Sequence, residues 1–464
     1  MLERIAKACS GELVRGPGTL AINRICTDSR TVQPGDLFIA LAGERFDAHA
    51  FLPDAVKKGA AAVIVDRSRP VPELPGCAVI AVNNTRAALG SIAAQYRRQF
   101  HLPIIAVGGS NGKTTTKELL ASVLRQKFNT LSSEASFNND VGVPLTLLRL
   151  ERSHQVAVLE AGTNHPGELA PLIRMIRPRY GVITNIGREH LEFFETLAGV
   201  AREEGTLAEL LPGDGKLFIN GDGEWAGSIA KRSSAAVVRV GLDRGNDWRA
   251  TDVRVDGAGV RFRVAAPRPD LGGEYQIRLL GRHQVTNALL ALAVGAELGL
   301  DRAALERGLA ECPPPAMRMQ TWEFDGVRVL DDAYNANPDS MAAALQTLRD
   351  MPAAGRRIAV LGEMAELGAA SETEHEAVGR CAAESGVDQL FAVGRMASVM
   401  ARGARSAGLN RVLEFLEVEA AADAVRRFVK SGDVLLLKAS RVSRLERVAE
   451  LLKAGKGREG AGLA

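Results

Sequence analysis

The sequence predicts an α/β protein of three domains. The chain has 464 residues, which is too long for one ordinary domain. Short apolar runs typical of strands alternate with helical segments, and this alternation breaks near Val82 and at Pro313 to Pro315. We therefore predict a small N-terminal α/β domain at 1–82, a central domain with a mostly parallel sheet at 83–313, and a C-terminal Rossmann-like α/β domain at 314–464.

Composition excludes several classes of protein. Hydrophobic residues make up 46% of the chain and charged residues 24%, as is typical of a globular protein with sizeable cores. The net charge of +3 gives no sign of binding to nucleic acid or to an anionic membrane. The five cysteines are scattered without a CxxC motif, so we expect free thiols. Because no apolar run resembles a signal peptide or a membrane span, we expect a cytoplasmic protein without membrane insertion.

The N-terminal domain is predicted from two apolar strands, at 36–43 and 61–66, with a helix at 51–59 between them. Two segments beside these strands, at 27–30 and 43–51, are dense in polar side chains. Capping and turn chemistry would explain them as well as ligand binding does, and the residues alone leave both interpretations open.

The central domain begins with the stretch on which the functional prediction rests, IIAVGGSNGKTTTKELL at 104–120. An apolar strand, a glycine-rich turn and a helix follow one another, so backbone N–H groups can close around phosphate oxygens. Lys113 adds a positive charge for the terminal phosphates, and the hydroxyl of Thr114 can bind Mg²⁺. Val107 stands where this motif usually has glycine, so the loop is a variant. The alternative is an ordinary turn followed by a helix.

Two later strands of the central domain end at residues that can bind a metal. Glu160 follows the apolar run at 156–159, and His190 follows the run at 181–186. Ligands of open α/β sheets bind at the carboxyl ends of the strands, so both side chains are expected near the phosphate loop. Because Mg²⁺ prefers oxygen, we expect His190 to be a weak, outer or second-metal ligand. A turn carboxylate and a structural histidine are the alternatives.

The rest of the chain predicts further elements. The alternating pattern at 242–264 favours an antiparallel excursion, and 281–300 becomes an apolar helix with Asn287 near its start, as a cap or a ligand contact. Beyond the prolines, a strand and polar loop precede three β-rich runs at 356–364, 389–394 and 432–441. No GxGxxG motif occurs in this region, so a dinucleotide is not indicated. The glycine- and lysine-rich tail at 453–464 is expected to be frayed.

Eight motifs in this order resemble those of the ATP-dependent Mur ligases of peptidoglycan synthesis, nearly end to end. They are GGSNGKTTTKE, SFNNDVGVPLTLL, LEAGTNHPGEL, TNIGREHLEFF, GRHQVTNALLAL, DDAYNANPDSM, VLGEMAELG and LLLKASRVSRLE. The resemblance implies an N-terminal domain holding a uridine diphosphate (UDP) group, a central ATPase and a mobile C-terminal domain. YNANPDSM and LGEMAELG are most similar to members that add D-alanyl-D-alanine to UDP-N-acetylmuramoyl (UDP-MurNAc) tripeptide.

The resemblance also implies the reaction and the cofactors, ATP and Mg²⁺. The free carboxylate of the tripeptide attacks the γ-phosphate of ATP and becomes an acyl phosphate. The amine of D-alanyl-D-alanine then attacks the acyl carbon, and phosphate leaves. A carboxylate needs this activation because its oxygen is a poor leaving group. The implied partners are therefore small-molecule substrates, and we expect a monomer.

The residues implied in nucleotide and metal binding match the family motifs position by position. Lys113 is implied in stabilising charge on the transferring phosphoryl group, and Thr114, Glu160 and His190 in holding magnesium. The remaining nucleotide contacts implied by the resemblance are Gly109, Ser110, Asn111, Gly112, Thr115, Asn287, Arg318 and Asp332.

The residues implied in substrate binding come from all three domains. Two face the uridine diphosphate, two lie near the sugar-phosphate part, and four lie on the closing face of the last domain. In that order they are Ser29 and Arg30; Asn138 and Asn139; and Asn335, Asn337, Lys438 and Arg441.

One position departs from the family in a way that concerns catalysis. Members commonly carry a lysine after the TNIGREHLEFF region, which becomes carbamylated and supplies a carboxylate to a second magnesium. The aligned residue here is Glu204. Our hypothesis is that Glu204 supplies the negative charge itself, through a water or after a backbone shift because its side chain is shorter. A solvated acid on a helix face beside Glu203 is the alternative.

Three other functions compete with this interpretation. They are a diaminopimelate- or lysine-adding Mur-type ligase, a ligase similar to folylpolyglutamate synthase, and a non-catalytic P-loop nucleotide switch. The DNPR motif usual in diaminopimelate-adding members is absent, and the polar N-terminal domain and the YNANP segment argue against the first two. A switch would not need Glu160 and His190 together with a third domain that reaches the nucleotide.

Overall fold

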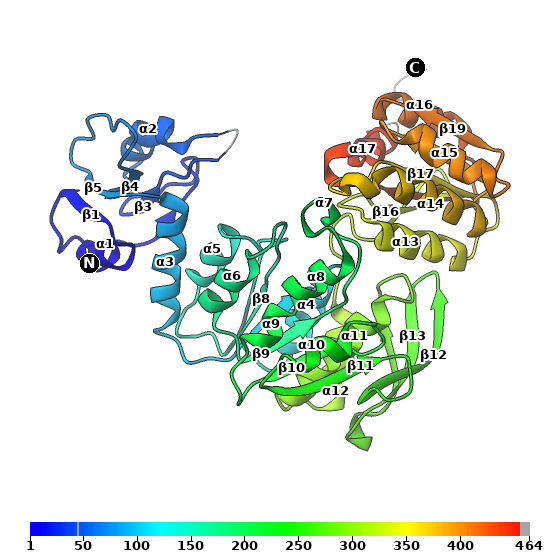
Figure 1. The fold of residues 1–464 in the computed structure, drawn as a ribbon, viewed down its shortest axis with the longest axis horizontal. Helices are drawn as coiled ribbons and strands as arrows, with labels where there is room; N and C mark the ends of the chain where they lie inside the picture. The colour runs from blue at the N-terminus through cyan, green and yellow to red at the C-terminus, as the bar shows by residue number, and fades with distance from the viewer. Residues whose placement is uncertain (44–45, 455–464) are drawn as a thin grey trace, which may run out of the picture.

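The computed structural model describes residues 1–43 and 46–454 and confirms three α/β domains, each built on its own sheet (Figure 1). Residues 44 and 45 of the polar segment at 43–51, and most of the tail expected to be frayed, lie outside the described residues. The five cysteines are free, as predicted. Among the described helices, none is long and apolar enough to cross a membrane.

The N-terminal sheet has the order β1-β5-β4-β3-β2, with only β1 antiparallel to its neighbour. The largely buried β4 and the fully buried β5 form its interior, and α3 leads from this domain to the next (Figure 1). The elements are α1 Leu2–Ala8, β1 Glu12–Arg15, β2 Ile25–Cys26, β3 Leu37–Ile39, η1 Ala48–Phe51, α2 Leu52–Lys57, β4 Ala62–Asp66, β5 Ala78–Val82 and α3 Thr85–Arg97.

The central sheet has nine strands in the order β14-β13-β12-β11-β10-β9-β6-β8-β7. Strands β6 to β12 run parallel, whereas β12, β13 and β14 are antiparallel, which confirms the predicted excursion. The strands are β6 Ile104–Gly108, β7 Thr130–Ser132, β8 Val156–Glu160, β9 Tyr180–Ile183, β10 Lys216–Asn220, β11 Ala236–Gly241, β12 Trp248–Asp256, β13 Gly259–Ala265 and β14 Gly273–Ile277. The helices are α4 Lys113–Arg125, α5 Gly142–Leu147, α6 Leu169–Ile176, α7 Leu191–Phe194, α8 Leu197–Glu204, α9 Thr206–Glu209, α10 Ala226–Ala230, η2 Pro269–Leu271, α11 Gln284–Glu297 and α12 Arg302–Glu311.

The C-terminal sheet has the order β15-β16-β20-β17-β18-β19, parallel except for β15. Sequence analysis missed the two edge strands, β15 and β19, because both are largely exposed and lack the apolar run of a central strand. The strands are β15 Gln320–Phe324, β16 Val327–Asp332, β17 Arg357–Leu361, β18 Gln389–Val393, β19 Val412–Phe415 and β20 Val434–Lys438. The helices are α13 Pro338–Asp350, η3 Gly368–Ala370, α14 Ser371–Glu384, α15 Ala397–Ser406, α16 Val418–Phe428, η4 Arg441–Ser443 and α17 Glu446–Ala454.

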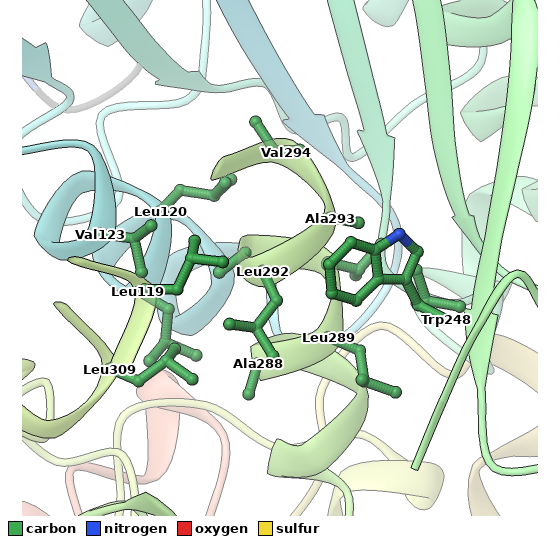
Figure 2. Close-up of a cluster of buried hydrophobic side chains, with 14 of the residues drawn as sticks. Leu119, Leu120, Val123, Trp248, Ala288, Leu289, Leu292, Ala293, Val294 and Leu309 are labelled. Carbon is green, nitrogen blue, oxygen red and sulfur yellow. The ribbon is translucent and has the colours of Figure 1, made fainter. Parts of the chain in front are cut away.

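Helix α4 is anchored in the core of the central domain by its apolar face. Figure 2 shows Leu119, Leu120 and Val123 of α4 pointing toward α11 and toward Leu309 of α12. Helix α11 is apolar on nearly its whole circumference, so it is buried against the sheet as well as against α4. This packing fixes α4 and α11 relative to each other, and the site described below lies at their N-terminal ends.

We expect Leu289→Ala to lower the free energy of unfolding by about 2–5 kcal/mol, because it opens a cavity between α11 and its neighbours. Leu289 is completely buried in the cluster drawn in Figure 2. Leu416→Ala is the matched control, since Leu416 is 68% exposed and its truncation should change stability little. Urea unfolding measures both variants, and equal losses would contradict the assigned packing.

Candidate active site

A cavity of about 590 Å³ is lined by the central and C-terminal domains. Most of the residues that sequence analysis predicted for the site lie around it. From the central domain these are Ser110, Asn111, Gly112, Lys113, Thr114, Thr115, Asn138, Asn139, Glu160, His190 and Asn287. From the C-terminal domain they are Arg318, Asp332, Asn335, Asn337 and Lys438.

The floor of the cavity is the loop between β6 and α4. Two of its glycines have backbone angles that other residues rarely adopt, with φ of +107° at Gly109 and +82° at Gly112. A Cβ atom at Gly109 would lie 2.4 Å from Thr184 Oγ1, and one at Gly112 would lie 2.7 Å from Asn287 Oδ1. The loop can therefore lie against β9 and α11, and the free N–H groups at the start of α4 form an anion-binding end.

The Lys113 side chain is folded against the loop. Its Nζ donates to the carbonyl oxygens of Gly109 at 2.5 Å and Ser110 at 3.2 Å, and to Glu189 Oε2 at 3.3 Å. Burial disfavours the charged form, but the carboxylates of Glu189, Glu204 and Glu160 outweigh that effect and raise the pKa of Lys113. Lys113 is thus held as a cation where phosphate oxygens would bind.

Thr114 and Glu160 form a pair of hard oxygen donors beside the loop. Thr114 Oγ1 donates to Glu160 Oε2 at 2.9 Å, and Asn138 Nδ2 donates to Glu160 Oε1 at 2.8 Å. Magnesium is commonly held by one or two such oxygens together with nucleotide phosphates and waters, so this pair fits it. Over residues 1–43 and 46–454, no cluster of three or more His, Cys, Asp or Glu side chains could hold a metal on its own.

His190 lies on the cavity wall but is engaged by the C-terminal domain. Its backbone is left-handed, with φ of +49°, and its Nδ1 forms a hydrogen bond with Glu366 Oε2. This hydrogen bond and the charge of His190 lower the pKa of Glu366. Sequence analysis missed Glu366, because its partner comes from another domain.

Glu204 lies beneath the phosphate loop. It is 1% exposed, and its Oε2 accepts the N–H of Gly109 at 2.6 Å, while Oε1 has no protein partner. Burial raises the pKa of Glu204 to about 7; the Lys113 charge opposes this effect and Glu189 adds to it. The alternative of a solvated helix-face acid is therefore wrong. Glu203 is also buried, and it accepts the N–H groups of Gly167 and Leu169.

The C-terminal wall of the cavity is ordered by its own contacts. Lys438 Nζ lies 2.5 Å from Asp332 Oδ2, and the guanidinium of Arg318 stacks over Tyr334 at 4.3 Å from the ring centre. Tyr334 also forms a hydrogen bond with Ser136 of the central domain. Asn337 also contacts the central domain, where its Nδ2 donates to Asn111 Oδ1 at 2.9 Å. Within the central domain, Asn287 Nδ2 donates to Gln284 Oε1 at 2.8 Å.

Four predicted residues with side chains lie outside the lining of this cavity, and Glu204, beneath the phosphate loop, is one of them. Ser29 and Arg30 belong to the N-terminal domain, where Arg30 is exposed and pairs with Asp28 at 2.7 Å. That pairing lowers the pKa of Asp28 to about 2. Arg441 pairs instead with Glu446 at 3.2 Å. The structure therefore gathers the nucleotide- and metal-site candidates but not the candidates for the uridine diphosphate.

Comparison with known proteins identifies the family. Residues 21–97, 107–295 and 317–441 match, in turn, "Mur ligase family, catalytic domain", "Mur ligase middle domain" and "Mur ligase, glutamate ligase domain". The chain is 36% identical over 457 residues to the UDP-N-acetylmuramoyl-tripeptide–D-alanyl-D-alanine ligase of Escherichia coli, covering 97% of this chain and 98% of the relative. The chain belongs to the Mur ligase family. It is therefore an ATP-dependent ligase.

Solved structures of Mur ligases have the same fold over the same length. A crystal structure of MurF from Acinetobacter baumannii has a TM-score of 0.89 and 32% identity, covering 98% of both chains. MurF from Thermotoga maritima, solved in complex with ADP, has a TM-score of 0.80 and 27% identity over 94% of this chain and 98% of that one. This Mur ligase therefore shares its fold with these structures over nearly its whole length.

The raised pKa of Glu204 predicts a pH-dependent stability of this Mur ligase. The unfolded chain ionises Glu204 near its ordinary pKa of 4.5, whereas the folded chain does so near 7. Over this range the folded state binds more protons than the unfolded state. The free energy of unfolding of wild type therefore falls as the pH rises from about 4.5 to 7, by on the order of 3 kcal/mol. Glu204→Gln, which cannot ionise, should lack this loss.

Urea unfolding at about pH 5 and pH 8, followed by tryptophan fluorescence, measures the effect. Two of the three tryptophans, Trp225 and Trp248, lie in the central domain with Glu204. The variant should gain stability relative to wild type at the higher pH. If the free energies of unfolding of the two proteins differ by the same amount at both pH values, the assignment of a raised pKa to the buried Glu204 carboxyl is wrong.

Proposed function

We propose that this ligase joins D-alanyl-D-alanine to UDP-MurNAc-tripeptide in peptidoglycan precursor synthesis, giving UDP-MurNAc-pentapeptide, ADP and phosphate. The observation that carries the proposal is the cavity in which a phosphate loop, Glu160 and the C-terminal wall meet. The names of the full-length relatives support this choice of substrates. The proposal includes Mg²⁺ as cofactor, a monomeric enzyme, a cytoplasmic location and domain boundaries near residues 82 and 313.

The phosphate loop would hold ATP by its triphosphate. Free N–H groups at the start of α4 and the ammonium of Lys113 provide the donors, and Lys113 would stabilise charge on the γ-phosphoryl group during transfer. Thr114 and Glu160 would hold Mg²⁺, with His190 as a weaker or outer ligand positioned by Glu366. When bound, Mg²⁺ would neutralise negative charge on the phosphates.

The acyl-phosphate route assigns roles to the remaining predicted residues. The tripeptide carboxylate must approach the γ-phosphorus in line with the bond to the leaving ADP. UDP-MurNAc-tripeptide must therefore be held both at its uridine diphosphate end and near its carboxylate. Ser29 and Arg30 would hold the uridine diphosphate end, and Asn138 and Asn139 the sugar-phosphate part.

The C-terminal domain would complete the site around the acyl phosphate. Arg318 and Asp332, with Asn287 of the central domain, would contact the nucleotide. The peptide and phosphate would be enclosed by the closing face of the last domain, which consists of Asn335, Asn337, Lys438 and Arg441. Enclosure limits attack of water on the acyl phosphate, so that the D-alanyl-D-alanine amine reacts instead.

Glu204 would contribute its negative charge from beneath the loop. Its contact with the Gly109 N–H holds the start of the loop, and its charge helps to keep Lys113 protonated. No lysine, and hence no carbamate, is needed at this position. Glu204 therefore acts through the loop in this proposal.

Phosphate release from ATP tests the substrate assignment. We expect release to require UDP-MurNAc-tripeptide and D-alanyl-D-alanine together, because neither attack can occur without its nucleophile. Omitting each substrate in turn provides the controls. Release with neither substrate, with glutamate and a folate, or with diaminopimelate or lysine and the muramoyl dipeptide would overturn the proposal.

Glu204→Ala should reduce kcat at least about tenfold, which corresponds to about 1.4 kcal/mol of transition-state stabilisation. Glu203→Ala is the matched control, because Glu203 is a buried neighbour on the same helix that contacts α6 rather than the loop. Rates are compared per folded molecule by active-site titration with ADP. Full turnover and unchanged magnesium dependence in Glu204→Ala would show that the carboxylate has no part in catalysis.

A further inference from the structure

The segment 187–192, which follows β9 and ends within the first two residues of α7, contacts the phosphate loop on one side and the C-terminal domain on the other. On the loop side, the Gly187 N–H donates to Ser110 Oγ at 2.8 Å, and Glu189 accepts from Lys113. Figure 1 shows α7, in which this segment ends, next to the C-terminal domain. The segment is therefore placed to couple the two parts of the cavity.

Arg188 makes the densest contact with the C-terminal domain. Its backbone N–H donates to Asp339 Oδ2 at 2.6 Å, and its Nε and Nη2 both donate to Asp339 Oδ1, at 3.0 and 2.6 Å. Its Nη1 donates to Glu374 Oε2 at 2.9 Å. One arginine of the central domain thus binds both the first turn of α13 and helix α14 of the C-terminal domain. Charge-assisted hydrogen bonds of this kind are stronger and more directional than neutral ones.

The other contacts of the segment point to the same docking face. The Glu192 N–H donates to the carbonyl oxygen of Glu366 at 3.0 Å, and Leu191 packs against the apolar core of the C-terminal domain. Within the described ranges 1–43 and 46–454, every ion pair between the central and C-terminal domains involves either Arg188 or His190. Arg188 forms two of these pairs, so it carries most of the charge attraction across this boundary.

We propose that Arg188 is a positioning residue that holds the C-terminal domain over the phosphate loop through Asp339 and Glu374. The inference rests on the proposed function in one respect, that nucleotide binds in the cavity both domains line. Arg318, Asp332 and Lys438 line that cavity and belong to the C-terminal domain, so the position of this domain places them there. The nearby pair of Asn337 with Asn111 aligns the same end of α13 with the loop.

We call the ion pairs of Arg188 with Asp339 and Glu374 the latch. Loss of the latch should change ligand affinity more than kcat. A ligand that contacts both domains binds only the docked fraction, so its apparent affinity falls by the factor by which that fraction falls. Arg188→Ala should therefore weaken ADP binding and raise the KM for ATP by about tenfold, with a smaller change in kcat once substrates saturate the enzyme. Arg188→Lys should recover only part of the affinity, because lysine cannot form the forked pair.

The experiment combines ADP titration calorimetry, steady-state kinetics and small-angle X-ray scattering on the full chain. Asp339→Asn should weaken ADP binding as Arg188→Ala does, and the double variant should be no weaker than either single variant. Loss of the latch should also increase the radius of gyration. Arg402→Ala is the matched control, because Arg402 pairs with Glu372 and Glu376 inside the C-terminal domain alone.

The outcomes separate the latch from folding effects and from the proposed function. ADP affinity and KM of Arg188→Ala within twofold of wild type, additive losses in the double variant, or equal losses in Arg402→Ala would each overturn the latch. ADP binding and scattering need no peptide substrate. A failure of the D-alanyl-D-alanine assay would therefore overturn the substrate assignment and leave the latch result standing.

Discussion

The site depends on one constraint, the charge balance around Lys113. An ammonium group held against a loop in a largely buried place is tolerated only if acceptors and negative charges surround it. Here two carbonyl oxygens and the carboxylate of Glu189 accept hydrogen bonds from its ammonium group, and Glu204 and Glu160 add negative charge. These groups keep the lysine protonated, and the excess of carboxylates prepares the site for the cation that accompanies a nucleotide.

The strand order explains how distant parts of the chain reach this lysine. Strands β8 and β9 flank β6 on either side, so their carboxyl ends meet where the phosphate loop begins. Glu160 ends β8, and the segment with Glu189 follows β9. Helix α8 then brings Glu204 under Gly109 from the segment after α7. The apolar packing of α4 against α11 keeps the loop fixed beneath these groups.

Features that depend on a local sequence pattern or on the end of a strand could be predicted from the sequence alone. The strand, glycine turn and helix around Lys113 were readable because each has its own signature, and Glu160 followed from its place after an apolar run. The position of Glu204 was not readable, because helical spacing does not tell whether an acid faces solvent or a loop 95 residues earlier. Glu189, Arg188 and Glu366 were missed for a related reason: their partners depend on how folded units dock.

The contacts that sequence analysis could not predict are concentrated where the central and C-terminal domains meet. Arg188 and His190 sit three residues or fewer from Gly187, which touches the phosphate loop, yet their partners lie in a different sheet domain. A short segment that touches both sides can make closure and phosphate binding interdependent. Such coupling suits an acyl phosphate, which must be formed and consumed away from water.

Transfer of ¹⁸O tests most directly whether this cavity activates a carboxylate with ATP. UDP-MurNAc-tripeptide labelled with ¹⁸O in its terminal carboxylate is converted with D-alanyl-D-alanine, and the released phosphate is analysed by mass spectrometry. Attack of the carboxylate on the γ-phosphate followed by departure of phosphate leaves one labelled oxygen in each phosphate. If the pentapeptide forms as fast as from unlabelled substrate but the released phosphate carries no ¹⁸O, the carboxylate is not activated as an acyl phosphate.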